Sequence, residues 1–192
     1  MSHANILTLE MDKNKTHSWL RSAGLVILSS ILIGLFAKVA IPLPFTPVPI
    51  AIQGYVILIL SSFLGPKRAA AAVIAFLVQG AAGLPVFAGG VGGMIKLFGP
   101  TGGYLFGYLI AAFLVGTLME RIVNRTPMKL FGVLGAGNAV IFLFGVPYLA
   151  AFIGFKQAVL LGLAPFVIGD LIKLVASVKI LQWILPVFHR VR

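Results

Sequence analysis

The chain has 192 residues, of which 60% are hydrophobic and only 10% are charged, and its mean hydropathy is +1.09. Soluble domains carry about 25% charged residues, so this composition excludes a soluble fold and indicates an integral membrane protein. The net charge of +11 comes from cations placed mostly between apolar runs, which excludes a nucleic-acid-binding surface. The absence of cysteine excludes disulfides and thiolate chemistry, and the three histidines, all near the termini, provide no metal or catalytic centre.

Hydropathy divides the chain into two parts. Residues 1–20 are mostly polar and are expected in the cytoplasm, whereas residues 21–192 form a single membrane domain. A helix needs about 20 apolar residues to cross a bilayer. Six runs approach this length, and the predicted fold is therefore an all-α integral membrane protein with six transmembrane helices. These runs cover residues 21–41, 49–64, 69–84, 101–119, 129–152 and 163–187.

The loop cations predict the orientation of these spans. Ten lysines and arginines flank the spans on one side, whereas Lys38, Lys96 and Lys156 lie on the other. Cytoplasmic loops carry an excess of lysine and arginine. Both termini are therefore predicted to lie in the cytoplasm, and the loops after the first and third spans are predicted to face outward.

Both of these outward loops have unusual compositions that predict order. Residues 41–53 contain four prolines, which fix φ and remove backbone donors, so this segment is expected to be a stiff, extended connector. Residues 83–104 are rich in glycine but also contain apolar side chains such as Phe87 and Met94. Irregular backbone at membrane depth survives only when it is buried in protein or lines a cavity. The glycine-rich segment is therefore interpreted as a re-entrant or lid-like loop.

The last span contains an acid and a base. Asp170 is the only acid within an apolar span, and Lys173 follows three residues later on nearly the same helical face. Ionisable side chains within a membrane are costly and usually mark a functional site. An internal ion pair that only locks the helix is the alternative. A ligand site with an acid beside a base suits a zwitterionic or amphoteric small molecule.

Weaker signals come from scattered polar and small residues. Polar side chains within or beside the spans are more often helix–helix hydrogen bonds or interface aromatics than ligand contacts. These are Gln53, Gln79, Tyr104, Tyr108, Asn138 and Tyr148. Ser30 and Gly34 in the first span have the spacing that lets another helix approach closely, which predicts a partner interface there.

Three segments together resemble the BioY family, the biotin-specific substrate-binding (S) components of energy-coupling factor (ECF) transporters. They are PLPFTPVPIAIQ, GLPVFAGGVGGMIKLFGPTGGYLFGY and PFVIGDLIKL. The resemblance covers residues 41–178 and implies six helices, high-affinity capture of biotin and no catalysis. It also implies a transmembrane T component and two ATPase subunits as partners, with Ser30 and Gly34 docking the T component. No cofactor is expected, since biotin is the transported ligand.

The resemblance also implies site residues. Asp170 and Lys173 correspond to the acid and lysine of the family site, while the proline-bearing and glycine-rich loops, the latter including Gly89 and Gly90, close around biotin. Apolar or aromatic walls for the thiophane ring are expected from Phe87, Tyr104 and Tyr148. Lys96 replaces a residue that is usually apolar in the family, and it is either a second cation for the biotin carboxylate or a solvated loop lysine.

Other functions remain open from the sequence alone. The same architecture fits an S component for a different vitamin. An intramembrane enzyme using Asp170 is a weaker alternative, because no nucleophile or metal-binding set accompanies this acid. A structural membrane subunit is the remaining possibility. No Walker A sequence is present, so any energy for transport comes from a partner or an ion gradient.

Overall fold

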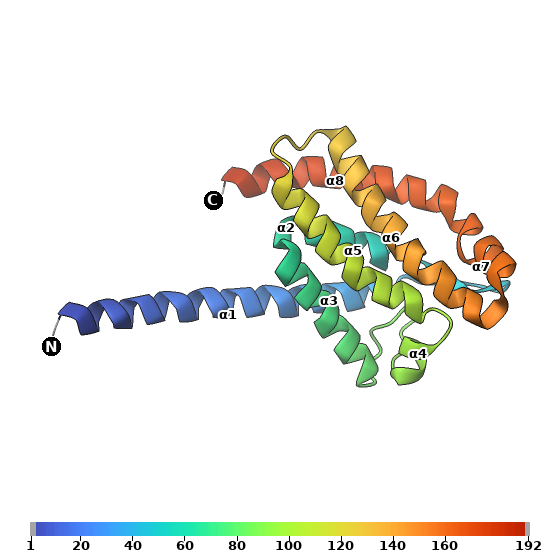
Figure 1. Ribbon diagram of the computed structural model, residues 1–192, viewed down its shortest axis with the longest axis horizontal. Coiled ribbons are helices and arrows are strands. Elements are labelled where there is room, and N and C mark those ends of the chain that lie inside the picture. The colour runs from blue at the N-terminus through green and yellow to red at the C-terminus, as the bar shows by residue number, and fades with distance from the viewer. Residues whose placement is uncertain (1–2, 191–192) are drawn as a thin grey trace.

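The computed structural model describes the backbone of residues 3–190 and the side chains of residues 18–186. The described residues form an almost entirely helical bundle with one small hairpin (Figure 1). Its elements are α1 (His3–Ala37), β1 (Ala40–Leu43), β2 (Thr46–Ala51), α2 (Gln53–Leu64), α3 (Pro66–Ala81), α4 (Met94–Phe98), α5 (Gly102–Arg121), α6 (Pro127–Ile153), α7 (Phe155–Gly162), the 3-10 turn η1 (Ala164–Phe166) and α8 (Val167–Arg190).

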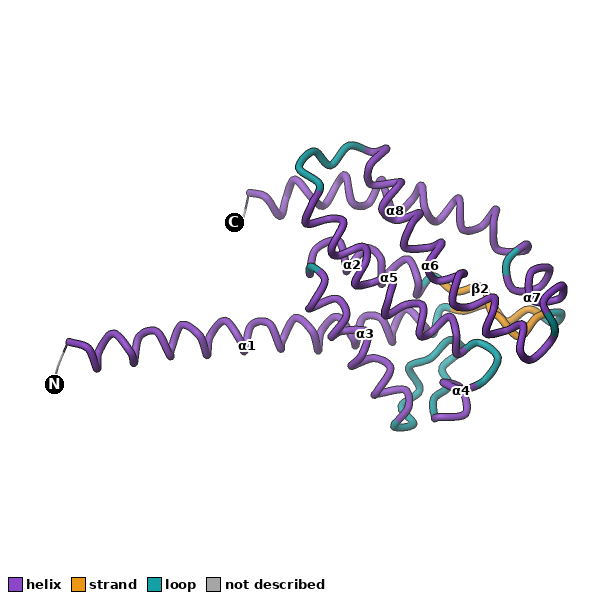
Figure 2. Tube along the Cα trace, in the orientation of Figure 1, coloured by secondary structure: helices purple, strands orange, loops and turns teal. Residues whose placement is uncertain are grey.

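The bundle has two distinct ends. The hairpin, α4 and α7 gather at one end, and the turn between α2 and α3 and the loop between α5 and α6 lie at the other (Figure 2). Both termini extend from the side of the second end (Figure 1). The side chains of the expected cytoplasmic segment up to residue 17, and those from residue 187 onward, lie outside the described residues.

Among the described residues, four helical stretches are long and apolar enough to cross a membrane: Ser18–Ala37, Gly102–Arg121, Pro127–Ile153 and Phe155–Pro186. The first, second and third of these lie close to the expected spans. The fourth stretch contains most of the expected last span, 163–187, but begins earlier, at α7. The other two expected spans, 49–64 and 69–84, correspond to shorter helices, α2 with 12 residues and α3 with 16. The prediction placed the second span from residue 49, but Pro49 belongs to β2, and helix therefore begins only at Gln53.

The proline-rich segment is extended, as predicted, but it folds back on itself. β1 and β2 pair antiparallel, with Ala40 opposite Ala51 and Leu43 opposite Thr46. The prediction of an all-α fold is therefore wrong at this point. Proline lacks a backbone donor and is tolerated at sheet edges, and in a two-stranded sheet every strand is an edge. The tip of the hairpin is held by Thr46, whose hydroxyl donates to the Leu161 carbonyl in α7 at 2.9 Å.

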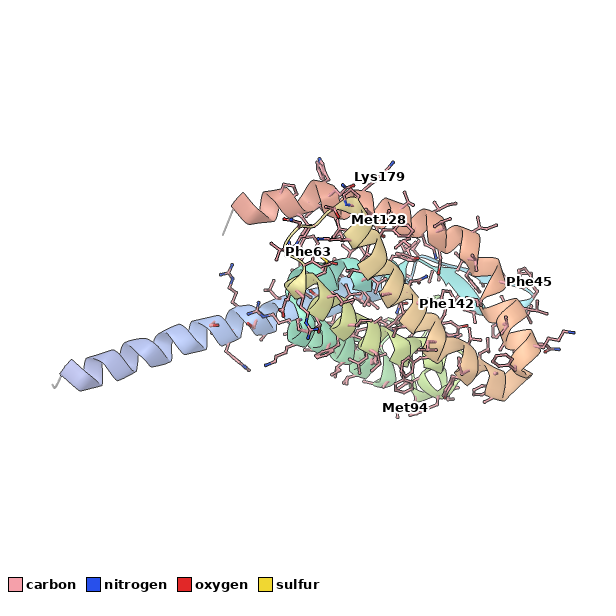
Figure 3. All side chains as sticks on the ribbon, turned by 45° about the horizontal axis from the view of Figure 1, so that its top comes forward. Phe45, Phe63, Met94, Met128, Phe142 and Lys179 are labelled. Carbon is pink, nitrogen blue, oxygen red and sulfur yellow. The ribbon has the colours of Figure 1, made fainter. Side chains whose placement is uncertain are left out.

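The core forms two hydrophobic clusters on either side of α5. One gathers side chains from α2, α5, α6 and α8, and the other joins α1 and α3 to α5. The side chains that point away from these clusters include Phe45, Met94 and Met128, which are 55%, 54% and 80% exposed (Figure 3). An apolar surface this extensive is typical of a protein that faces lipid.

Glycine permits the close packing of α6 against α5, which predicts a stability difference. A Cβ atom on Gly145 would overlap the ring of Tyr104, whereas one on Gly132 of the same helix would meet nothing within 4 Å. Gly132→Ala is therefore expected to stabilise the helix by up to about 1 kcal/mol, and Gly145→Ala to cost about 1–3 kcal/mol through overpacking. Thermal unfolding in detergent measures both, and equal midpoints for the two variants would contradict this packing.

Candidate ligand-binding site

The ion pair predicted from the sequence forms near the start of α8. The Nζ atom of Lys173 lies 2.5 Å from Oδ1 of Asp170. Asp170 occupies the first turn of α8, where the helix dipole favours a carboxylate, and the residue is only 7% exposed. Desolvation offsets much of the attraction in such a pair, so it contributes little to stability. Its position inside a membrane protein marks a candidate functional site.

Three other elements hold this pair in place. The Nδ2 atom of Asn138 in α6 donates to Oδ2 of Asp170 at 3.1 Å. Lys173 Nζ donates to the backbone carbonyl of Ala51 at the end of β2 at 3.3 Å and lies 5.3 Å from the ring centre of Tyr55 in α2. The Tyr55 hydroxyl in turn donates to the backbone carbonyl of Asp170 at 2.8 Å. The charges therefore face protein from α2, α6 and the hairpin rather than lipid.

A narrow cavity adjoins the pair. It is bounded by β2, α2, α5, α6 and α8, and its wall is mostly aromatic and aliphatic apart from Asn138 and the two charges. The lining includes Val48, Pro49, Tyr55, Tyr104, Tyr108, Asn138, Phe142, Phe166, Asp170 and Lys173. The space that the centre of a water molecule can reach is about 60 Å³. An apolar pocket with a few convergent polar groups is the usual form of a small-molecule site.

Tyr104 lines this cavity with its ring. Its hydroxyl donates to the Gly162 carbonyl at 2.8 Å, and its ring meets Phe142 edge-on with centroids 6.1 Å apart. Because the hydroxyl already has a partner, the ring face is what Tyr104 offers to a ligand. Tyr104 thus has a position that suits the wall expected from the sequence.

The other expected residues of the glycine-rich loop lie away from the cavity. Phe87 is fully buried and packs edge-on against Phe76, with centroids 5.4 Å apart, in the cluster between α1, α3 and α5. The role of Phe87 as a ligand wall stays a prediction, and in this arrangement its ring anchors the loop to the core. Gly89 and Gly90 have φ of +82° and +72° and shape the turn that follows Phe87, and they do not line the cavity.

Tyr148 and Lys96 are also absent from the cavity wall. The Tyr148 hydroxyl donates to the carbonyl of Phe98 at 3.1 Å, so this side chain ties α6 to the end of α4. Lys96 is half-buried on α4, at the same end of the molecule but outside the cavity. The structure therefore separates these two residues from Asp170 and Lys173, although all four are expected at one site from the sequence.

The small residues of α1 pack within the chain. The Ser30 hydroxyl accepts from Nε2 of Gln79 in α3 at 3.0 Å, and Ser30 is fully buried. A Cβ atom on Gly34 would lie 3.1 Å from Cβ of Val86. The small-residue spacing is real, but the close neighbours are α3 and the start of the glycine-rich loop. Docking of a partner protein by Ser30 and Gly34 stays a prediction, and in this structure both residues pack against the chain itself.

Sequence reasoning missed Tyr55 and gave Asn138 little weight, although both contact Asp170. Asn138→Ala is expected to weaken ligand binding about 10- to 150-fold, because a hydrogen bond to a charged group contributes about 1.5–3 kcal/mol. The matched control is Gln79→Ala, which removes an inter-helix amide bond far from the cavity and should leave binding unchanged. Calorimetric titration measures both, and equal losses would show that the effect is general loosening of the bundle.

Helices that can span a bilayer, together with a buried ion pair beside an aromatic cavity, define a membrane protein that binds a small molecule. The sequence pattern of the BioY family matches residues 9–190. The chain belongs to the BioY family.

Individual relatives agree with this assignment. The chain is 40% identical to the biotin transporter BioY of Thermotoga maritima over 141 residues, which cover 73% of this chain and 82% of that protein. It is 35% identical to the probable biotin transporter BioY of Pyrococcus horikoshii over 136 residues, covering 71% and 80%. It is also similar to the crystal structure of the S-component for biotin from an ECF-type ABC transporter, with a TM-score of 0.77 and 29% identity over 88% of this chain and 92% of that one. These relatives are named as transporters and a transport component rather than enzymes.

Proposed function

We propose that this chain is the biotin-binding S component of an ECF-type transporter and takes up biotin across the membrane. The relatives named as biotin transporters and the similar S-component for biotin support this function. The observation that carries it is the Asp170–Lys173 pair, buried beside a cavity with aromatic walls. Such a pair supplies an acceptor and a cation at one place in an otherwise apolar interior.

The chemistry of biotin fits these groups. Its ureido ring offers two N–H donors, and the carboxylate of Asp170 accepts at least one of them. Lys173 pairs with the valerate carboxylate of the ligand, or neutralises Asp170 when the site is empty. The rings of Tyr55, Tyr104 and Tyr108 supply the apolar walls for the thiophane ring.

Binding of biotin requires the cavity to widen. The space that water centres can reach there, about 60 Å³, has room for only a few water molecules. The hairpin forms part of its wall, and the hydrogen bond from Lys173 to Ala51 is one of the contacts that hold it there. Biotin therefore enters by displacing the hairpin, and its carboxylate replaces the Ala51 carbonyl as the partner of Lys173.

The proposed placement in the membrane has six spans in the cytoplasmic (inner) membrane, with both termini in the cytoplasm. α2 and α3 form the two shorter spans, and the hairpin and the glycine-rich loop face outward. The distribution of loop cations supports this orientation. A transmembrane T component and two ATPase subunits supply the energy, because the chain lacks a Walker A sequence.

The orientation predicts which single cysteines an impermeant maleimide labels in intact cells. Ile95 on α4 and Val123 between α5 and α6 are matched positions, 90% and 93% exposed at opposite ends, in a chain without native cysteine. Ile95→Cys is expected to react in intact cells, and Val123→Cys only after permeabilisation. The reverse pattern would contradict the proposed orientation.

The ligand is tested by calorimetric titration of the purified full chain with biotin, riboflavin and thiamine. Saturable binding of biotin alone is the expected result. Preferential binding of riboflavin or thiamine would make the chain an S component for another vitamin. Conversion of a bound compound would indicate an enzyme, and the absence of any binding would favour a structural subunit.

A further inference from the structure

A second cavity lies at the end of the bundle opposite the hairpin. It is formed by the turn between α2 and α3, the last turns of α5 and the loop that follows α5. The space that water centres can reach is about 390 Å³, far more than in the cavity beside Asp170. Four charged side chains line it, namely Lys67, Arg68, Glu120 and Arg125. The proposed biotin site uses none of these residues.

The charges of this second cavity do not balance. Three cations face one carboxylate, which leaves a surplus of two positive charges. Across the described side chains, residues 18–186, the only ion pair is Asp170–Lys173, so the three cations have no carboxylate partner there. Glu120 lies against the chain at Gly65, where a Cβ atom would be 2.5 Å from its Oε1 atom. The cavity therefore presents cations to an anion from outside the chain.

The start of α3 borders this cavity. α3 begins at Pro66, which has no N–H group, and the Ala69 N–H donates to the Gly65 carbonyl. Lys67 and Arg68 therefore carry the free N–H groups at this helix start. The first N–H groups of a helix have no partner within it and attract anions. A Cβ atom on Gly116 of α5 would lie 2.6 Å from the Pro66 nitrogen, so only glycine lets the two helices meet here and form the cavity wall.

The surface that continues from the cavity is apolar. On α3, Ile74 and Val78 follow Lys67 at intervals of seven and eleven residues and are 48% and 61% exposed. On α5, Phe113 and Phe106 precede Glu120 by seven and fourteen residues and are 52% and 37% exposed. A soluble anion would leave these two apolar stripes without a contact. Acyl chains attached to a phosphate would lie along them.

We propose that this cavity binds the headgroup of an anionic glycerophospholipid. The phosphate oxygens accept hydrogen bonds from Lys67, Arg68 and Arg125, and the acyl chains cover the exposed stripes of α3 and α5. Basic pockets between helices at the cytoplasmic side of membrane proteins are suited to lipid headgroups of this charge. The location at the end that carries most loop cations places the site in the cytoplasmic leaflet, which rests on the proposed orientation.

The test is a lipid titration of the detergent-solubilised full chain, followed by native mass spectrometry. Phosphatidylglycerol and phosphatidylcholine with identical acyl chains are compared, with inorganic phosphate as a competitor in a third arm. The wild type is expected to bind phosphatidylglycerol at least tenfold more tightly than phosphatidylcholine. Replacing Lys67, Arg68 and Arg125 together by Gln is expected to weaken the binding of phosphatidylglycerol roughly 100-fold, at about fivefold per cation.

The matched control replaces three exposed cations outside the cavity by Gln, namely Arg21, Arg121 and Lys129. It should keep the preference for phosphatidylglycerol over phosphatidylcholine. Glu120→Gln is expected to tighten phosphatidylglycerol binding about fivefold, a gain that misfolding does not produce. Equal affinity of the wild type for the two lipids, or equal losses in both triple variants, would overturn the proposal. Full displacement of lipid by inorganic phosphate would overturn the lipid assignment and leave a site for free phosphate. None of these results depends on biotin binding.

Discussion

Asp170→Asn is expected to weaken biotin binding by about 30-fold to several thousand-fold. Loss of one partner of a buried, charge-assisted contact costs roughly 2–5 kcal/mol. The substitution keeps the size of the side chain but removes its charge and turns one acceptor oxygen into a donor. The amide then presents N–H groups where the ureido ring needs an acceptor, and Lys173 is left without a countercharge.

The appropriate control for this variant is Lys156→Gln. It also removes one charge at the hairpin end of the molecule, but from an exposed position on α7 outside the cavity. Calorimetry on both proteins in the same detergent compares their affinities for biotin. Wild-type affinity in Asp170→Asn would show that biotin does not depend on this carboxylate, and the proposed site would then be wrong.

The second large effect separates binding from stability. Asp170→Leu alone leaves Lys173 as an uncompensated charge whose side chain is 80% buried. This variant is expected to lose about 3–5 kcal/mol of stability. The double variant Asp170→Leu, Lys173→Met removes both charges and is expected to regain wild-type stability or exceed it by about 1–4 kcal/mol. Both variants are expected to lose biotin binding.

Thermal unfolding without ligand, measured beside a biotin titration, distinguishes the two roles of the pair. A stable double variant that no longer binds biotin means that the pair is kept for the ligand. A double variant that is as unstable as Asp170→Leu alone would mean that the ion pair locks α8 in place, which is the structural alternative that the sequence left open.

The sequence predicted most of the helices because each depends on a local pattern of length and hydropathy. The boundaries of α5 and α6 lie within two residues of the expected spans. The ion pair could also be predicted from the sequence, since a spacing of three residues places two side chains on a common helical face. Both features are properties of one continuous segment.

Features that depend on distant segments were harder to predict. Tyr55 and Asp170 are 115 residues apart, and only the packing of α2 against α8 brings them together. Prolines indicate extended backbone, but they do not indicate that the chain returns on itself to place Ala51 beside Lys173.

Side chains with two plausible environments were the hardest to place from the sequence. Phe87 is apolar in a loop rich in glycine, which fits a ligand wall and a core anchor equally well until α3 is placed beneath it. Ser30 and Gly34 have a spacing that allows a close neighbour, and the neighbours are α3 for Ser30 and the start of the glycine-rich loop for Gly34. A pattern of small residues gives the distance of closest approach but does not identify the neighbour.

The most direct measurement of the central claim is a crystal structure of the full chain with biotin bound. We predict the ureido ring against the carboxylate of Asp170, the thiophane ring among the tyrosines of the cavity, and the Lys173 ammonium released from Ala51 with the hairpin displaced. Biotin found elsewhere on the protein, with the Asp170–Lys173 pair and its contact to Ala51 unchanged, would contradict this account.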